Sequence, residues 1–476
     1  MTTPQAPRTE FVRAISRLDA TALVVGSMIG SGIFIVSADI LRQVQSPGLL
    51  LLVWGLSGVV TLLGALTYGE LAAMFPKAGG NYVYLREGIS PLFGYLYGWT
   101  LFVVIQTGTI AAVAVAFARF TSVLVPGLSP DVFLGTTLHF PQPIGDIAVG
   151  LSAQRIFAIV SIVVLTWINV RGVRTAAFIQ TSLTVIKTAA LAGLIVLGIT
   201  IGRNADAIAS NFGPTFWPVS GLTLAVLPAI GAAMVGSLFS MDAWNNVGFA
   251  SGELKQPEKD LPFAMATGVL TVTTLYVLAN VAYLHVLPAD AIAHAPQDRV
   301  GTAALQAMFG APGLYIMAVA IMISTFGCNN GLILSGARVY YAMAVDNLFF
   351  KSAAVLHPQY KTPAVALVVQ AVWTCVLCLS GTYSQLLNFV IFAAVAFYLV
   401  TAIGLFALRR KRPDLARPVR APGYPWLPAI YVALTGLIAI NLLLQEATQT
   451  YSFLGLALVV LGVPVYYGWR KWAAPA

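Results

Sequence analysis

The sequence predicts an all-α polytopic membrane protein with twelve transmembrane helices, arranged as a 5+5 inverted repeat followed by two C-terminal helices. Three observations predict this fold: the composition, twelve long apolar runs, and polar interruptions in the first and sixth runs. Of the 476 residues, 58% are hydrophobic and only 9% are charged, whereas a soluble domain carries roughly 25% charged residues. The mean hydropathy is +0.84. The chain therefore builds membrane spans rather than soluble domains.

The apolar runs have about the length that a helix needs to cross a bilayer, roughly 20 residues. Clusters of Pro, Gly and charged residues separate them. The runs lie at 18–41, 48–75, 91–125, 154–171, 174–202, 221–250, 263–287, 312–345, 363–380, 384–408, 427–446 and 450–469. The chain then divides into a cytosolic N-terminal tail (1–17), a first five-helix repeat (18–202), a second, inverted repeat (221–408), a basic cytosolic linker (409–426) and helices 11 and 12 (427–470).

The basic residues predict how these spans are oriented. An even number of spans puts both termini on one side, and most of the 26 Lys and Arg residues fall in segments on that same side. The positive-inside rule assigns this side to the cytoplasm. We therefore expect a multi-pass protein of the cell inner (plasma) membrane with both termini cytoplasmic. The net charge of +9 then reflects orientation, and we expect contact with the lipid bilayer but no nucleic-acid partner.

The first run contains an interruption that an anchoring helix would not need. Gly26, Gly30 and Gly32 stand near its middle, together with Ser27 and Ser31. Glycine costs about 1 kcal/mol relative to alanine inside a helix, and non-helical backbone at membrane depth occurs only where protein or a water-filled cavity surrounds it. The segment indicates a broken helix that exposes backbone groups to a solute. The alternative is a packing face, because Gly26 and Gly30 form a GxxxG motif.

The sixth run has its own interruption, five spans after the first. Asp242, Asn245 and Asn246 are polar residues that match lipid poorly. Paired interruptions in spans one and six are what two inverted repeats of five helices give. An odd number of spans in each repeat turns the second copy upside down relative to the first. Spans eleven and twelve then lie outside the repeats.

Several motifs occur together along the first ten spans. They are Gly26-Ser-Met-Ile-Gly-Ser-Gly-Ile-Phe34, Gly69-Glu70-Leu71 with Phe75-Pro-Lys-Ala-Gly-Gly-Asn-Tyr-Val-Tyr84, Asp242-Ala-Trp-Asn245, and Gly252-Glu-Leu-Lys-Gln-Pro257 with Leu261-Pro262. In combination they resemble the amino acid–polyamine–organocation superfamily, in its L-type amino acid transporter-like bacterial branch of permeases and exchangers. The resemblance implies the leucine-transporter-like fold, with amino acids as the substrate class.

A zwitterionic substrate needs donors for its carboxylate and acceptors for its ammonium group. The start of the outer half of span one offers free N–H groups and the positive end of a helix dipole to the carboxylate. Carbonyls at the end of the inner half and in span six can accept from the ammonium group, and the resemblance implies the same positions. Phe239 either lies over the substrate as an outer gate or packs in the core. The candidate substrate-binding residues are Ser27, Met28, Ile29, Gly30, Ser31, Gly32, Phe239, Ser240, Asp242 and Trp244.

Lys187 is a basic residue that the sequence places in the middle of a span. A lysine at the centre of an apolar helix costs about 2.5–3.5 kcal/mol on insertion scales, so it should face the protein interior and have a partner. The resemblance implies that this lysine replaces the sodium ion of related carriers and bridges span one near Gly26 to span eight, at Ser324 or Thr325. We therefore expect sodium-independent transport, and proton coupling through Lys187 stays open. The alternative is a side chain that extends to an interface.

Asp242 stands where many L-type relatives carry glycine, and its role is open. The carboxylate either contacts the substrate ammonium group or takes up a proton, or it forms the N-cap of the inner half of span six. Five further charged residues map to cytoplasmic ends of spans. They either pair as an inner gate or form surface pairs without function; they are Glu70, Arg86, Glu87, Glu253 and Arg338.

These features predict a secondary active transporter of amino acids that works by alternating access, with small or medium neutral L-amino acids as the first expected substrates. Cationic amino acids or polyamines are the alternative, because Asp242 offers a carboxylate. A membrane enzyme or a channel is more remote, since the four histidines lie far apart and no catalytic spacing or filter-like repeat is present.

We expect no cofactor, no metal and no disulfide-linked glycoprotein subunit. A dinucleotide loop is excluded because no third glycine follows Gly32 at position 35. Cys375-x-x-Cys378 has no second cysteine pair and no nearby histidine, so it does not form a metal site. In eukaryotic L-type relatives the loop after span three carries the cysteine that pairs with the subunit, and the corresponding loop, 126–153, contains none.

Overall fold

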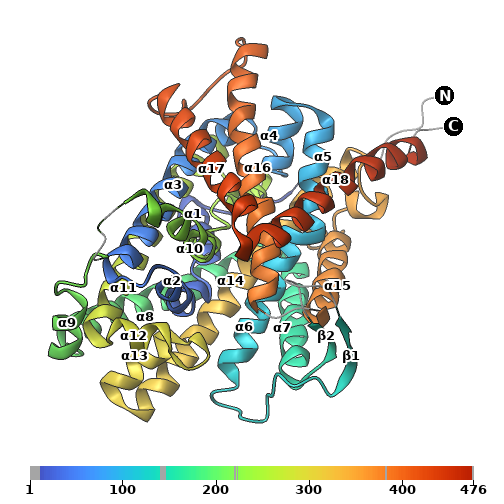
Figure 1. The fold of residues 1–476 in the computed structure, drawn as a ribbon. Coiled ribbons are helices and arrows are strands. Elements are labelled where there is room, and N and C mark those ends of the chain that lie inside the picture. Colours follow the sequence, from blue (N-terminus) through green and yellow to red (C-terminus); the bar gives the residue numbers. More distant parts are fainter. Residues whose placement is uncertain (1–10, 140–145, 219–220, 222, 381–382, 474–476) are drawn as a thin grey trace, which may run out of the picture.

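The computed structural model describes residues 11–139, 146–218, 221, 223–380 and 383–473, and within them the protein is a bundle of helices (Figure 1). Ten helical segments of the described chain are long and apolar enough to cross a membrane. They are α1 with η1 (Arg17–Phe34), α3 (Pro47–Met74), α5 to α6 (Pro91–Thr121), α7 (Ala153–Val170), α8 (Val173–Thr200), α11 (Pro257–Val286), α14 (Ala311–Val345), α16 (Tyr383–Lys411), α17 (Trp426–Leu444) and α18 (Glu446–Ala473).

Shorter helices complete the bundle. Two of them, α10 (Leu227–Ser240) and α15 (Ala364–Ser380), lie in the runs predicted as spans six and nine. Between α5 (Pro91–Thr100) and α6 (Gln106–Thr121) the backbone forms one π-helical turn, η2 (Leu101–Ile105). The remaining short elements are α2 (Val36–Val44), α4 (Asn81–Gly88), α9 (Ala205–Asn211), η3 (Leu224–Val226), η4 (Asn246–Gly248), η5 (Ser251–Glu253), α12 (Ala289–Ala293), η6 (Pro296–Asp298), α13 (Val300–Phe309) and η7 (Lys351–Ala354).

One extramembrane loop departs from the all-α prediction. Within 126–153, strand β1 (Leu134–His139) pairs antiparallel with β2 (Asp146–Leu151), in a register that places Leu134 opposite Leu151. The prediction failed here because it rested on the apolar runs, and this loop lies between two of them. Consecutive β-branched threonines, Thr136 and Thr137, favour the extended backbone of β1.

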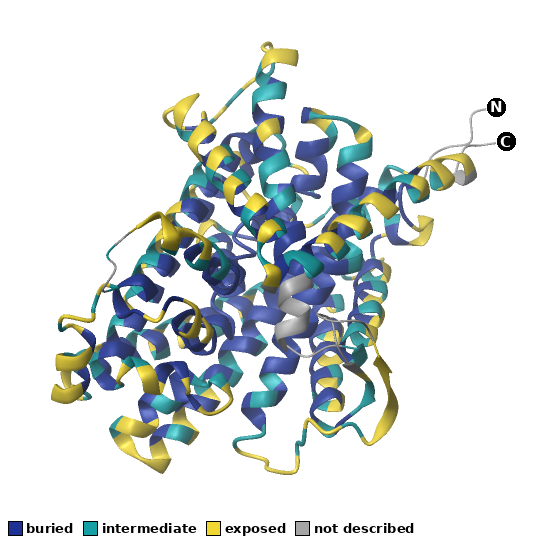
Figure 2. Ribbon diagram, viewed as in Figure 1, coloured by how far each residue is buried: buried dark blue, intermediate teal, exposed yellow. Residues whose placement is uncertain are grey.

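The buried residues concentrate where the long helices cross, and exposed residues lie at the periphery (Figure 2). α11 packs against α3, α1 and α8, while α14 packs against α6, α8 and α1. Large apolar side chains face outward along the membrane-spanning helices, including Val163, Val185 and Leu437. Such outward apolar faces are typical of helices surrounded by lipid, because a soluble protein rarely exposes large contiguous apolar patches.

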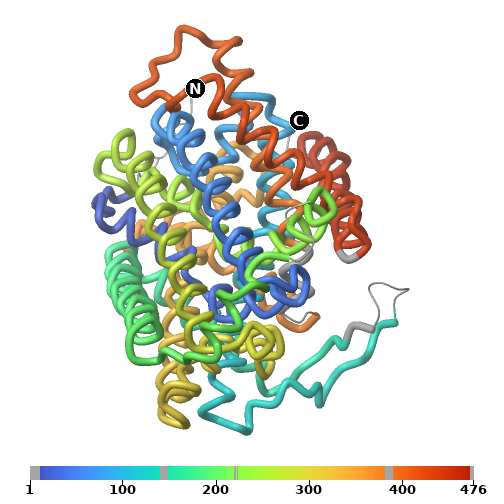
Figure 3. The backbone as a smooth tube through the Cα atoms, turned by 60° about the vertical axis from the view of Figure 1, so that its left-hand side comes forward, coloured from blue at the N-terminus to red at the C-terminus, as the bar shows by residue number. Residues whose placement is uncertain are grey.

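A basic linker follows α16 and returns to the end of α3. Glu70 is fully buried and accepts from Arg409 Nε at 2.9 Å and from the backbone N–H of Ala421 at 2.8 Å. Arg417 Nε lies 3.3 Å from the same carboxylate. The linker and the β-hairpin occupy opposite ends of the molecule (Figure 3).

Candidate functional site

The first membrane helix is interrupted where the glycines predict. α1 ends at Met28, and the N–H of Gly30 donates back to the carbonyl of Met28 at 2.9 Å. The chain then forms the 3₁₀ turn η1 (Gly32–Phe34) before α2 begins at Val36. A Cβ atom at Gly32 would lie 2.0 Å from Ser240 Oγ. Glycine is therefore required at Gly32, because the interrupted part of span one touches the end of α10 there.

Lys187 supplies hydrogen bonds to the carbonyl groups that this interruption frees. Its side chain is buried within α8, with a relative exposure of 1%. The ammonium group donates to the carbonyl oxygens of Gly26 at 2.5 Å, Ile29 at 2.8 Å and Ser324 at 3.2 Å. These three bonds use all three donors of the ammonium group. The alternative prediction, that the Lys187 side chain extends to a membrane interface, is wrong. The predicted contact with the Gly26 carbonyl is present.

Of the two predicted partners on span eight, only Ser324 reaches the interruption. Ser324 Oγ donates to the carbonyl oxygens of Ile29 at 3.0 Å and Gly30 at 3.1 Å, and its own carbonyl accepts from Lys187. Thr325 Oγ1 instead bonds carbonyls of its own helix, at Ile321 and Met322. The difference follows from helix geometry, because consecutive residues of a helix point in directions about 100° apart.

Two further side chains satisfy carbonyls of the interrupted helix, and the sequence did not single them out. Cys328 Sγ donates to the carbonyl of Ser27 at 2.9 Å. Tyr276 OH lies 2.8 Å from the carbonyl of Met28 and 3.2 Å from the carbonyl of Ser240. Tyr276 thus joins the end of α1 to the end of α10. The available signal was a tyrosine hydroxyl in the middle of an apolar span, which requires a partner.

Backbone donors remain available beside these carbonyls. Among the residues that the structure describes, the N–H groups of Gly32 and Ile33 donate to no atom. Ser27 Oγ is likewise buried without a partner in the described chain. Ser31 is buried at the same turn, as the N-cap of η1. The interruption therefore presents free N–H donors next to partly used carbonyl acceptors.

The sixth span ends differently from the prediction. α10 stops at Ser240, and residues 241–245 form turns in which Ala243 has a φ of 67°. No α-helix begins at Asp242, because η4 starts at Asn246 with Asn245 as its N-cap. The prediction that Asp242 caps the inner half of span six is therefore wrong, and that inner half consists of turns and 3₁₀ segments.

Asp242 belongs to a buried polar and aromatic cluster. Its carboxylate accepts from the hydroxyl of Tyr398 on α16. Trp244 packs edge-on against Tyr68, with ring centroids 4.9 Å apart, and lies 5.5 Å from the ring of Tyr398. The cavity beside this cluster measures about 20 Å³ and is lined partly by Thr61 on α3, which is room for about one water molecule.

The remaining predicted residues lie either at the interruption of span one or in the cluster around Asp242. Phe239 and Ser240 occupy the last turn of α10, and both are buried. Ser240 Oγ donates to the carbonyl of Gly236 at 2.8 Å. The backbone carbonyl of Ser240 lies 3.2 Å from Tyr276 OH. Trp244 lies with Asp242 rather than at the Gly30 interruption. The structure thus brings the span-one candidates together with Ser240, and it groups Asp242 and Trp244 around Tyr398.

Charged residues form ion pairs at the end of the bundle that contains the first turn of α1. Glu253 and Arg338 are each 1% exposed and pair through two hydrogen bonds, of 2.8 Å and 3.2 Å. Burial raises the pKa of Glu253, and the neighbouring guanidinium offsets this only in part. Arg86 pairs with Asp346 and Glu87. The Glu253–Arg338 pair is thus buried rather than a surface pair.

Comparison with known proteins assigns the chain to a family. Residues 15–464 match the Amino acid permease family. The chain is 31% identical to the Serine/threonine exchanger SteT of Bacillus subtilis, over 96% of this chain and 97% of that protein. It is 32% identical to the Large neutral amino acids transporter small subunit 2 of Homo sapiens (96% and 80% covered) and 29% identical to the Asc-type amino acid transporter 1 of Mus musculus (97% and 82%). The protein is a multi-pass membrane protein and a member of the amino acid permease family.

Proposed function

We propose that the protein is a secondary active transporter that exchanges small or medium neutral L-amino acids, independently of sodium and by alternating access. The observation that carries the proposal is the interrupted first span, where carbonyls and free N–H groups meet in a buried position. The names of the relatives support it, because they describe a serine/threonine exchanger, a large neutral amino acid transporter and an Asc-type transporter.

The substrate carboxylate would accept hydrogen bonds from the backbone at Gly32 and Ile33, with Ser31 adjacent. Two free N–H groups near the start of α2 form the kind of site that binds anions. The ammonium group would donate to the remaining lone pairs of the carbonyls of Ser27, Met28 and Ser240. Each carbonyl has two lone pairs, so a bond from Cys328 or Tyr276 does not exclude a second donor.

The ammonium group of Lys187 would replace a bound cation. Its ammonium group lies among three carbonyl oxygens and belongs to the chain permanently. Oxygen ligands of this kind also bind small hard cations. A covalently attached charge would remove the need for external sodium and couple α8 to the interruption in span one and to α14.

The topology proposed for this function has twelve spans. Two five-helix repeats (18–202 and 221–408) would be inverted relative to each other, with the linker 409–426 on the cytoplasmic side and helices 11 and 12 at 427–470. Both termini would be cytoplasmic in the cell inner (plasma) membrane, because the basic residues gather on that side. We propose that the chain works without a disulfide-linked glycoprotein subunit, since no cysteine occurs in the loop 126–153.

Cationic amino acids and polyamines are less favoured as substrates. Asp242 is the acidic residue that would recognise a second positive charge, but its carboxylate is engaged by Tyr398. The adjacent cavity of about 20 Å³ has no room for a cationic side chain. We also propose that the Asp242 carboxylate can take up a proton during transport.

Alternating access requires one end of the site to open while the other closes. The buried Glu253–Arg338 pair is the proposed inner lock, because η5 and α14 meet there beside the segment that leads into α1. Breaking a buried pair by removing one partner leaves an uncompensated charge. We therefore expect Glu253 and Arg338 to stay paired, or to gain other partners, when this end of the protein opens.

The test is uptake of labelled amino acids into proteoliposomes, with and without unlabelled amino acid inside. We expect labelled serine, threonine, alanine or leucine to enter faster when the lumen is loaded, and replacement of sodium by potassium to leave uptake unchanged. Ser324→Ala should lower uptake, whereas the matched variant Thr325→Ala should keep it near wild type, because only Ser324 reaches the interruption. Absence of uptake under every gradient would refute transport, and equal effects of the two variants would refute the site.

A further inference from the structure

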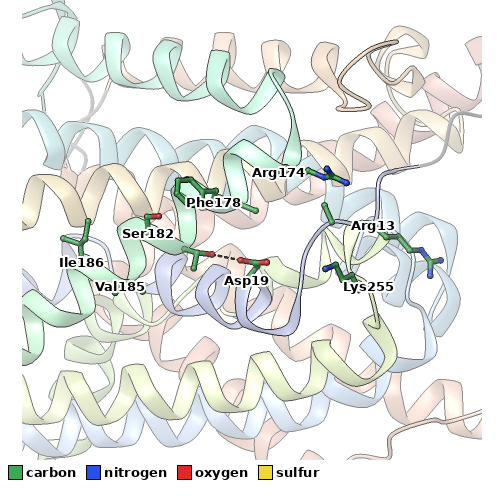
Figure 4. Close-up of a pocket in the computed structure, with 11 residues that line it drawn as sticks. Arg13, Asp19, Arg174, Phe178, Ser182, Val185, Ile186 and Lys255 are labelled. Atoms are coloured by element: carbon green, nitrogen blue, oxygen red, sulfur yellow. Dashed lines mark hydrogen bonds between the residues drawn. The ribbon is translucent and has the colours of Figure 1, made fainter.

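A large groove lies apart from the interrupted helices, between the N-terminal segment, the first turn of α1 and the outer face of α8 (Figure 4). Its volume is about 700 Å³. Arg13, Arg174 and Lys255 gather at one end of it, and Phe178, Val185 and Ile186 follow α8 away from that end. The groove is thus divided into a cationic part and an apolar part.

The cationic end is built by backbone contacts rather than by loose surface chains. Ile15 and Leu254 form a parallel β-bridge, in which the N–H of Ile15 donates to Glu253 and the N–H of Lys255 donates to Ile15. This bridge fixes the backbones that carry Arg13 and Lys255 close together. Arg174 stands at the second position of α8, on the facing wall.

The three cations outnumber the acidic side chain of the groove lining, Asp19, whose charge attracts Lys255. Arg13, Arg174 and Lys255 are exposed, and within the described ranges their side chains make no ion pair and no hydrogen bond. Asp19 is the acidic residue of the groove lining. Its carboxylate already accepts from Ser16 Oγ at 2.6 Å and from Thr181 Oγ1 at 2.9 Å. The groove therefore attracts an anion.

The apolar part of the groove lies on the exposed face of α8. Phe178 and Val185 are 72% and 63% exposed on α8, a helix long and apolar enough to cross the membrane. A soluble anion would use the cationic end alone. A phospholipid would use both ends, because its charged headgroup is attached to an acyl chain and the cationic end of the groove adjoins the apolar part.

We propose that this groove binds one anionic phospholipid, with the phosphate among Arg13, Arg174 and Lys255 and an acyl chain along Phe178, Val185 and Ile186. The lipid would connect the N-terminal segment to α8, the helix that carries Lys187. This inference does not depend on the transported substrate. It is tested by binding alone, so its failure and the failure of the transport proposal are distinguishable.

The test is native mass spectrometry of the full chain in detergent, titrated with phosphatidylglycerol or with phosphatidylcholine of the same acyl chains. We expect phosphatidylglycerol to bind more tightly, and the triple variant Arg13→Gln, Arg174→Gln, Lys255→Gln to weaken it by about tenfold or more. The matched triple variant Lys351→Gln, Arg410→Gln, Lys471→Gln removes the same charge from exposed positions elsewhere and should bind as wild type. Equal binding by the two triple variants would overturn the proposal.

A second arm separates a lipid from a free phosphate. Phe178→Ser with Val185→Ser should weaken phosphatidylglycerol binding several-fold while leaving the cationic end intact. Inorganic phosphate at the same concentration should not displace the lipid. If phosphate displaces it fully and the serine variant binds lipid as wild type, the groove is a site for a soluble anion and the lipid proposal is wrong. Circular dichroism of each variant checks that these exposed substitutions leave the fold intact.

Discussion

The interruptions in spans one and six touch each other at Gly32 and Ser240, yet different parts of the chain satisfy their backbone groups. In span one the freed carbonyls accept from side chains on α8, α11 and α14, which lie far away in the sequence. In span six most of the turns close on themselves, as in the bonds from Asp242 N–H to Phe239 and from Gly248 N–H to Asn245. Tyr276 of α11 also lies 3.2 Å from the Ser240 carbonyl.

The difference teaches that the two interruptions respond to different changes. An unpaired buried backbone group costs about as much as a lost hydrogen bond, so span one depends on every helix that supplies a donor. Span six depends mainly on its own backbone conformation. Substitutions far away in the sequence should therefore disturb the first interruption, and substitutions within the turn should disturb the second.

The largest expected effect comes from Lys187→Met, which keeps most of the aliphatic chain and removes the charge. Three carbonyls lose the bond from the ammonium group, although Ile29 keeps its bond from Ser324 Oγ. A hydrogen bond to a charged group contributes about 1.5–3 kcal/mol. We expect amino acid uptake into proteoliposomes to fall at least about tenfold. Lys351→Met, at an exposed position, is the matched control. Uptake near the wild-type rate would mean that span one does not rely on this remote donor.

Tyr276→Phe should have a smaller effect, because it removes one neutral hydroxyl that joins the two interruptions. A hydrogen bond of this kind contributes about 1 kcal/mol, so we expect uptake to fall about fivefold. Tyr283→Phe is the control, since within the described chain the Tyr283 hydroxyl bonds the carbonyl of Ile33 at 3.3 Å and does not join the two interruptions. If both variants behave alike, the bridge between Met28 and Ser240 has no special importance.

Asp242→Asn tests the carboxylate that follows α10 and accepts from Tyr398. Asparagine keeps the size of the side chain and still accepts from Tyr398, but it cannot titrate. We expect uptake measured between about pH 5 and pH 8 to vary about threefold less than in the wild type. Thermal unfolding followed in parallel checks the fold. A pH profile parallel to that of the wild type would exclude proton uptake by this residue.

The smallest effect is expected for Ala243→Gly. Ala243 has a positive φ, a conformation that costs an alanine about 1 kcal/mol and costs glycine nothing. We expect the melting temperature to stay level or to rise by a few degrees. Ala243→Val should lower it, because a β-branched residue is strained in the left-handed region. Destabilisation by glycine would show that span six, like span one, depends on remote contacts.

Much of the fold was legible in the sequence, because membrane spans require long apolar runs and interruptions require glycine or polar residues. The interruption at Gly30 and the burial of Lys187 followed from these rules. A lysine in the middle of an apolar helix cannot stay unpaired, so its interior position was predictable. Its partners at Gly26 and Ser324 were suggested by the family resemblance.

The rest depended on how helices far apart in the sequence are placed against one another. A tyrosine within an apolar run indicates that its hydroxyl needs a partner, but the sequence does not say which one. The role of Tyr276 appears only when α11 lies beside both interruptions. Asp242 followed by Ala243 has the composition of a helix start, but the positive φ of Ala243 turns the chain away instead. The β-hairpin escaped notice because the prediction followed apolar runs only.

The carboxylate of Glu70 has a consequence for how the protein can be shortened. Among the described residues, its bonds come from beyond residue 408, through Arg409, Arg417 and Ala421. A truncation at residue 408 would remove Arg409, Arg417 and Ala421 and leave this carboxylate at the end of α3 without them. The segment after residue 408 therefore holds the end of α3 in place, and residues 11–408 alone are not expected to form a stable protein.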